Sequence, residues 1–175
     1  MNSENTSGIK AFRADILHFL GDPGSTLDHK SSDQIEFIKD GLLVLKNGHV
    51  DAIGPANRLL SELPADCDVV DYSGQLIIPG MIDTHVHYPQ SDMIASYGEQ
   101  LLTWLETYTF PTESQFSDHE HARDVSRFFL NELLRNGTTT ALVFGTVHPE
   151  SVDAFFEEAQ QRNLRMIAGK VMMDR

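Results

Sequence analysis

The chain has 175 residues, of which 41% are hydrophobic and 22% are charged, which leaves room for one modest globular domain or one and a half small ones. Its formal net charge is −13, and because an acidic surface repels phosphate backbones, we expect no nucleic-acid partner. The single cysteine, Cys67, excludes an internal disulfide and favours a reducing compartment.

The sequence carries no signal for a membrane or for export. No segment approaches the roughly 18 consecutive apolar residues of a membrane-spanning helix. The N-terminus, from Met1 to Lys10, is polar and lacks the apolar stretch of a signal peptide. We therefore expect a cytoplasmic protein with no membrane partner.

The first third of the chain is typical of strands joined by tight turns. A strand is predicted from Ala11 to Phe19, and Gly21 to Ser25 has the composition of a loop. Asn47-Gly48 lies between two apolar runs, and Asn-Gly is the preferred type I′ hairpin turn. A further strand is predicted from Asp66 to Tyr72, ended by Ser73-Gly74.

An apolar run from Leu76 to Ile82 is predicted to be a buried strand with a Pro-Gly break, and it leads into Asp83-Thr84-His85-Val86-His87. Successive side chains on a strand point to opposite faces, so His85 and His87 point the same way. Neutral imidazole is a good ligand for zinc and other late first-row metals, so the pair predicts half of a metal site. The spacing alone leaves open two ordinary core or surface histidines in a chain that has eight.

After His87 the pattern alternates between helix and strand. Ser117 and Glu120 have capping-box spacing, which predicts a helix start, and Asn136-Gly137 predicts its end. The order strand, helix, strand, helix, strand implies right-handed crossovers and a parallel sheet, hence an α/β fold. The predicted elements are a helix over Tyr97–Thr109 that ends at Phe110-Pro111, a helix from Ser117 to Asn136, a strand over Thr138–Phe144, a helix from Pro149, and a strand over Arg165–Met172.

The stretch from Leu76 to His87 resembles the first barrel strand of the amidohydrolase superfamily, and the hairpin from Asp40 to Gly54 resembles the small domain that precedes its barrel. The resemblance implies a (β/α)8 TIM-like barrel behind a small β-sandwich. Residues 1–78 would be the N-terminal part of that sandwich, and residues 79–175 the first three β/α units of the barrel. Three parallel strands do not close a barrel, so we interpret the chain as the N-terminal portion of a longer protein or as a truncated product.

Further segments narrow the resemblance to the barrel-type guanine deaminases. It implies hydrolysis of guanine to xanthine and ammonia at one zinc ion per subunit, with Fe2+ as an alternative metal, in a homodimer when full length. His85 and His87 would be metal ligands, and Gln90 would contact the purine beside His87. The segments that carry it are Tyr88–Ile94, Tyr97–Leu105, Tyr108–Glu113, Asn136–Ala141 and Gly169–Asp174.

The resemblance also implies what this chain lacks. The remaining ligands, two histidines and an aspartate, would come from later barrel strands, together with the general acid and base and a purine-reading arginine. No catalytic residue is therefore assigned in this chain, and the chain alone is expected to be inactive. The small cytidine-deaminase-like enzymes need a Pro-Cys-x-x-Cys zinc motif, which one cysteine cannot supply.

Other polar or aromatic residues have ordinary interpretations. Asp83 shares the face of the two histidines and is interpreted as structural rather than as an orienter of the imidazoles. Trp104 is expected to pack, with stacking on a base as the alternative. His119-Glu120-His121 is interpreted as a solvated helix start, His148 as a residue that precedes a helix, and Lys170 as structural or solvent-facing.

Two alternatives to guanine deamination stay open. The same metal site could act on another purine, a pterin or a triazine. The chain could also be a non-catalytic fragment, and an uncovered apolar sheet edge would then make it prone to aggregation.

Overall fold

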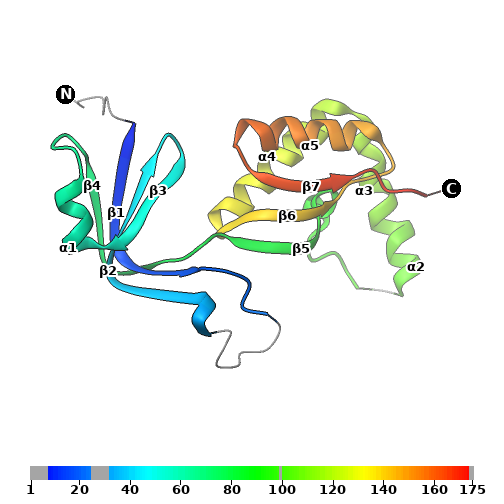
Figure 1. The fold of residues 1–175 in the computed structure, drawn as a ribbon. Coiled ribbons are helices and arrows are strands. Elements are labelled where there is room, and N and C mark those ends of the chain that lie inside the picture. Colours follow the sequence, from blue (N-terminus) through cyan, green and yellow to red (C-terminus); the bar gives the residue numbers. More distant parts are fainter. Residues whose placement is uncertain (1–7, 25–31, 99, 174–175) are drawn as a thin grey trace. The chain divides into compact units, whose positions relative to one another are not determined.

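The computed structural model describes residues 8–24, 32–98 and 100–173, and it divides into two compact units (Figure 1). The first unit ends at Pro79 and the second begins at Gly80. The fold is mixed α/β, as predicted. Ser25 of the predicted loop, and Glu99 and Asp174 of the segments that carry the family resemblance, lie outside the described residues.

The first unit is a four-stranded mixed sheet in the order β3-β2-β1-β4. β1 pairs antiparallel with β2 and parallel with β4, and β2 pairs antiparallel with β3. A buried apolar cluster from β1, β2 and α1 forms its core. The elements are β1 (Ile9–Phe19), a 3-10 turn (Ser32–Gln34), β2 (Ile35–Lys46), β3 (His49–Pro55), α1 (Ala56–Leu59), a 3-10 turn (Leu60–Glu62) and β4 (Val69–Ile77).

The hairpin between β2 and β3 turns at Asn47-Gly48, as predicted. Both residues have positive φ, 52° for Asn47 and 80° for Gly48, which a type I′ turn requires. The predicted strand at Ala11 is confirmed as β1, and the described part of the Gly21 loop contains no helix or strand.

β4 differs from the strand predicted over Asp66–Tyr72. It begins at Val69 and continues through Gly74 to Ile77. Gly74 has a φ of 83°, and the pairing of β1 with β4 shifts register around it. The glycine therefore forms a bulge within the strand rather than its end, because it adopts a conformation that an ordinary residue resists.

The predicted single strand over Leu76–Ile82 is wrong. β4 ends at Ile77, and β5 (Met81–His87) begins after Pro79-Gly80, because proline has no N–H to donate to a ladder. The apolar run is not buried either, since Leu76 in β4 is 52% exposed and Ile82 in β5 is 69% exposed. Both β4 and β5 are edge strands of their sheets, which leaves this run uncovered within the described residues.

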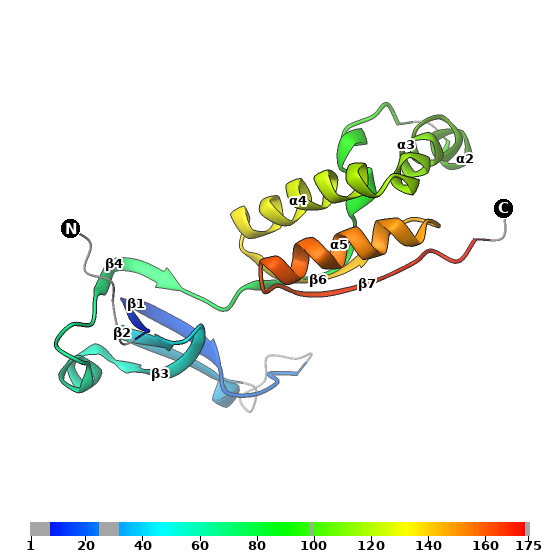
Figure 2. The same cartoon turned by 90° about the horizontal axis from the view of Figure 1, so that it is seen from above.

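The second unit is a parallel sheet in the order β5-β6-β7, with α4 and α5 packed along it (Figure 2). The parallel pairing confirms the prediction, although β7 is shorter than predicted. β7 ends at Gly169, after which the N–H of Val171 donates to Thr146 in the loop that follows β6. The elements after β5 are a 3-10 turn (Tyr88–Met93), α2 (Leu101–Trp104), a π turn (Leu105–Thr109), α3 (Phe110–Ser114), a 3-10 turn (Gln115–Ser117), α4 (His119–Arg135), β6 (Thr138–Phe144), α5 (Pro149–Gln161) and β7 (Arg165–Gly169).

The core of the second unit is built around Tyr88, the residue that follows β5. Its ring meets Phe116 edge-on at 5.3 Å between centroids and lies 5.1 Å from Phe155. Its hydroxyl donates a 2.5 Å hydrogen bond to the carbonyl of Ser151. Burial raises the pKa of Tyr88 to about 12, so the phenol keeps its proton and this anchor persists at neutral pH.

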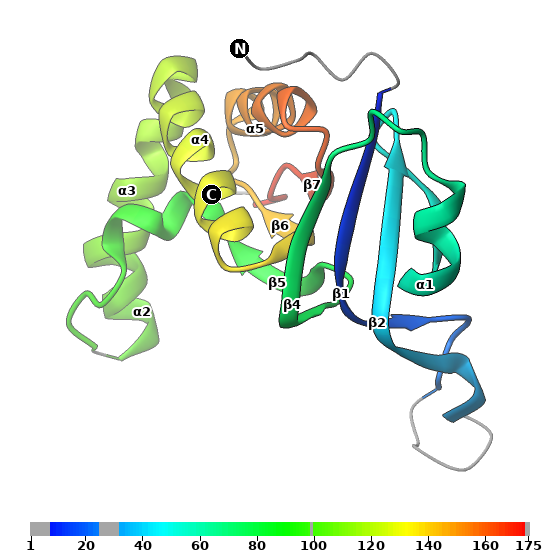
Figure 3. The ribbon, with the colours of Figure 1, turned by 90° about the vertical axis from the view of Figure 1, so that its left-hand side faces the viewer.

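The segment from α2 to α3 is a continuous helical column rather than a helix that ends before Pro111 (Figure 3). It begins at Leu101, four residues later than the helix predicted from Tyr97. Pro111 cannot donate to Thr107, and its ring crowds that carbonyl. The helix widens instead of ending, because the N–H of Phe110 donates to Leu105 across a π turn.

α4 begins one residue later than the capping-box spacing implied. The N-cap is Asp118, whose carboxylate accepts hydrogen bonds from the N–H groups of Glu120 at 2.9 Å and His121 at 3.4 Å. Ser117 belongs to the preceding 3-10 turn. The predicted end is confirmed, since Gly137 has a φ of 83° directly after Asn136.

Candidate functional site

Two imidazoles lie together at the C-terminal end of β5. The ring centroids of His85 and His87 are 5.4 Å apart, as expected for residues two apart on one strand. Phe144 at the end of β6 pairs with His87 in register, and its ring lies 4.8 Å from His85 and 4.7 Å from His87. An aromatic ring on the neighbouring strand therefore supports both imidazoles.

The two imidazoles differ in their surroundings. His85 is exposed and His87 is half-buried. Burial is the main cause that lowers the pKa of His87, and the nearby His85 lowers it further. The neutral imidazole, which is the form that binds metals, is therefore the favoured state of His87 at neutral pH.

Asp83 stabilises the backbone of β5 rather than orienting the imidazole rings. Its carboxylate accepts a 2.9 Å hydrogen bond from the backbone N–H of His85. The register of β5 against β6 shifts between Asp83 and Val86, so the carboxylate supplies the partner for an N–H where the ladder is interrupted. This contact favours the structural interpretation of Asp83.

Gln90 lies next to His87, on the 3-10 turn that leaves β5. Its Nε2 is 3.4 Å from Nδ1 of His87 and donates to Oε1 of Glu113 at 3.3 Å. Burial raises the pKa of the half-buried Glu113, and the hydrogen bond from Gln90 opposes that rise. Glu113 is the residue that sequence reasoning missed at this site, although it stands within one of the segments that carried the resemblance.

A cavity of about 690 Å³ opens beside the two histidines. Trp104 is half-buried and forms part of its wall. A second cavity, of about 590 Å³, includes Glu113 and His148. The residues around the first cavity are His85, Val86, His87, Gln90, Ser91, Met93, Ile94, Ala95, Ser96, Trp104, Phe128, Phe129, Glu132, Leu133 and Asn136.

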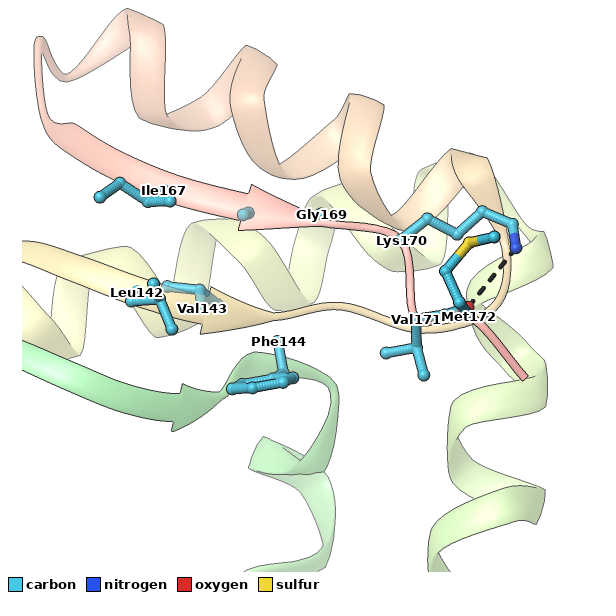
Figure 4. A pocket seen from close by; sticks show the side chains of 9 residues that line it. Leu142, Val143, Phe144, Ile167, Gly169, Lys170, Val171 and Met172 are labelled. Carbon is cyan, nitrogen blue, oxygen red and sulfur yellow. Dashed lines mark hydrogen bonds between the residues drawn. The ribbon is translucent and has the colours of Figure 1, made fainter.

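A third cavity, of about 340 Å³, lies over the ends of β6 and β7 and is lined mainly by apolar side chains (Figure 4). Phe144, the ring that supports the histidines, forms part of its wall. Lys170 is exposed, and its ammonium group donates to the carbonyl of Val171 at 3.4 Å. This placement agrees with a structural or solvent-facing lysine.

His119, His121 and His148 lie at helix starts. His119 is 3.5 Å from Glu157 of α5, and the ring of His121 packs edge-on against Phe116. His148 is the N-cap residue of α5. Across residues 8–24, 32–98 and 100–173, no group of three or more His, Cys, Asp or Glu side chains is placed to hold a metal ion.

Comparison with known proteins places this arrangement in a family. The model of the family described as "Amidohydrolase family" matches residues 76–175, which include β5 and all that follows it. The chain belongs to the amidohydrolase family. The match begins at the segment that precedes the two histidines.

This amidohydrolase chain is similar to guanine deaminases. It is 52% identical to guanine deaminase of Escherichia coli (strain K12), with all of this chain and 39% of that protein covered. The solved structure of the E. coli guanine deaminase covers 95% of this chain with a TM-score of 0.85. A guanine deaminase from C. acetobutylicum, solved with guanine in its active site, is 28% identical with a TM-score of 0.72.

The amidohydrolase chain thus spans about two fifths of the length of these relatives. Atrazine chlorohydrolase from Arthrobacter aurescens TC1, solved with zinc, shares the fold at 20% identity and a TM-score of 0.66. Within the described part of the chain, no helix is long and apolar enough to cross a bilayer.

Proposed function

We propose that the protein is a guanine deaminase, which hydrolyses guanine to xanthine and ammonia at a zinc centre. The observation that carries the proposal is the convergence of His85, His87 and Gln90 on one cavity at the end of β5. Similarity to guanine deaminases along the whole chain supports this choice of substrate. In the same proposal, the first unit is part of a β-sandwich and the second is the first three β/α units of a barrel.

The residues present suit a zinc ion. His85 and His87 offer two adjacent imidazoles, and the lowered pKa of His87 keeps its ring neutral and able to ligate. When bound, zinc supplies the Lewis acidity that activates water near neutral pH. A catalytic zinc site usually has three protein ligands, so the other ligands are assigned outside the described residues. Fe2+ would suit the same imidazoles.

Gln90 is assigned to the purine. Its amide can donate to and accept from a ring edge, and it adjoins His87 at the cavity wall. His87 would contact the base from the same side. General acid and base catalysis is assigned to later strands of the barrel, so the described residues bind and orient rather than transfer protons.

The remaining parts of the proposal concern the cellular setting. We place the protein in the cytoplasm, as a homodimer. The half-buried Cys67 is a free thiol whose pKa is raised by burial, which suits a reducing compartment. Size-exclusion chromatography with light scattering of the whole protein that the gene encodes tests the dimer.

Ammonia release from guanine by the whole protein tests the function. The His85→Ala variant should lose turnover and bound zinc together, because one of the two imidazoles on β5 is gone. His119→Ala makes the same substitution at the start of α4, away from the cavity, and should keep both. Turnover and zinc retained by His85→Ala would contradict the proposal.

A further inference from the structure

Glu113 makes a contact that the proposed function leaves unused. It lies on α3, 23 residues beyond Gln90, and its Oε1 accepts a 3.3 Å hydrogen bond from the side-chain amide of Gln90. The same amide nitrogen is 3.4 Å from Nδ1 of His87. A side chain from the helical column therefore contacts a residue beside the two histidines.

The chemistry of this contact selects one orientation of the amide. The two ends of a glutamine side chain have nearly the same size, but one end donates and the other accepts. An ionised carboxylate only accepts, so it holds the NH2 end of Gln90. The contact with His87 depends on which ring nitrogen carries the proton, whereas Glu113 accepts whenever it is ionised. Glu113 is therefore the partner that decides the orientation.

We infer that Glu113 is a positioning residue that holds the NH2 group of Gln90 and thereby presents Oε1 of Gln90 to the ligand. That oxygen would accept an N–H of the substrate, which selects rings that carry a donor at the edge facing Gln90. Guanine has such donors in its N1–H and its C2 amino group. The choice of guanine rests on the proposed function, whereas the orientation of the amide does not.

Glu106 provides a matched control. It lies on the same helical column and lines the same cavity as Glu113. Among the described residues, its side chain makes no hydrogen bond or ion pair. Glu106→Gln thus removes an exposed carboxylate from the wall of the same cavity without touching Gln90.

The experiment uses the zinc-loaded whole protein with the variants Glu113→Ala, Glu113→Gln and Glu106→Gln. Glu113→Ala should raise KM for guanine about 10-fold while zinc content stays at the wild-type level, because a charge-assisted hydrogen bond is lost. Glu113→Gln should recover most of the affinity, since its carbonyl oxygen can still accept from Gln90. A double-mutant cycle completes the set, and Glu113→Ala should add little in a Gln90→Ala background.

A second measurement does not depend on turnover. The NMR resonances of the Gln90 side-chain amide, assigned by their loss in Gln90→Ala, should move in Glu113→Ala and stay in place in Glu106→Gln. Resonances that do not move, or full additivity in the cycle, would overturn the inference. If they move while the wild type releases no ammonia from guanine, the role of Glu113 stands and the proposed substrate fails.

Discussion

Tyr88 joins the strand that carries the histidines to the core of the second unit. It is fully buried, and it directly follows His87. Its hydroxyl and ring fix the point where the chain leaves β5, and so the position from which Gln90 reaches back to His87. At the scale of single residues, the geometry of the site therefore rests on a side chain that does not face the cavity.

Removal of the Tyr88 hydroxyl should destabilise the fold. Tyr88→Phe removes the buried hydrogen bond from this hydroxyl to the carbonyl of Ser151, which should lower the free energy of unfolding by about 1–2 kcal/mol. Urea denaturation of the whole protein measures the effect. Tyr97→Phe is the control, because Tyr97 is 73% exposed and should change nothing. Equal effects of the two substitutions would contradict this account.

The site residues differ in how far sequence could predict them. Alternation along a strand is fixed by backbone geometry, so the pairing of His85 with His87 follows from their spacing. Gln90 was identified through the family resemblance, and the structure brings its amide to His87. Glu113 could not be predicted, because its direction depends on a π turn and on packing between segments far apart in the sequence.

At the scale of elements, local signals succeeded where one residue type decides the backbone. Asn47-Gly48 fixed the hairpin, and Gly137 ended α4. Local signals failed where two of them compete for the same position. Ser117 and Asp118 are both good caps, and the extended backbone at residue 118 favours the aspartate. Pro111 is typical of a helix end, but a widened turn accommodated it.

The N-cap of α4 can be tested by a pair of substitutions. Asp118→Ala should lower the free energy of unfolding by about 1 kcal/mol, because two N–H groups at the start of the helix lose their acceptor. Ser117→Ala should be nearly neutral, since the exposed Ser117 hydroxyl only donates to Ser114. Thermal unfolding followed by circular dichroism compares them. A larger loss in Ser117→Ala would show that the capping box is the correct description.

Glu158 links α4 to α5 and makes the pairing of these helices sensitive to acid. It is buried, and it is held by Arg162 of the loop after α5 at 2.6 Å and by Arg127 of α4 at 3.1 Å. Burial opposes ionisation of Glu158, but the hydrogen bonds and charges of the two arginines outweigh it and lower the pKa below the ordinary 4.5. The ionised carboxylate is therefore the form that stabilises the fold.

A lowered pKa fixes the sign of the pH dependence. The stabilisation by Glu158 is fully present above the ordinary pKa of 4.5 and is lost as pH falls through the lower pKa of the folded state. Glu158→Gln should cost about 2 kcal/mol at pH 7 and flatten the decline in stability below pH 4.5. Urea titrations across this pH range measure both effects. Asp153 is exposed on the same helix, and Asp153→Asn should leave the dependence of stability on pH unchanged. If the stability of Glu158→Gln fell with acid as steeply as that of the wild type, the assignment would be refuted.

At the scale of the whole molecule, the expected burial of the strand before the histidines was wrong for a reason of topology. An apolar run indicates that a strand is covered, but not which part of a protein covers it. Helices α4 and α5 lie on the same side of the sheet β5-β6-β7 (Figure 1), while Ile82 and Ile167 are 69% and 54% exposed. The order of strands and helices could predict the parallel α/β arrangement, whereas it could not predict what faces these side chains.

The number of imidazoles gives a prediction for the chain as a whole. The described residues bring two histidines to one cavity and no third ligand, and two ligands hold zinc poorly compared with three or more. The 175-residue chain by itself should therefore lose added zinc on desalting and release no ammonia from guanine. The whole protein should retain about one zinc per chain. The zinc content of each protein after desalting is the measurement. Stoichiometric zinc on the 175-residue chain would contradict the proposed ligand set.

The π turn before Pro111 changes the direction in which the later side chains of the helix point. Each residue of a regular α-helix advances about 100° around the axis, so one extra residue in a turn rotates every later side chain by roughly that angle. Glu113, two residues after the proline, owes its direction to this rotation. In a relative that lacks the proline, the same glutamate on an unwidened helix would point away from its glutamine. The combination Pro-x-Glu, rather than the carboxylate alone, is therefore the feature to trace among the amidohydrolases.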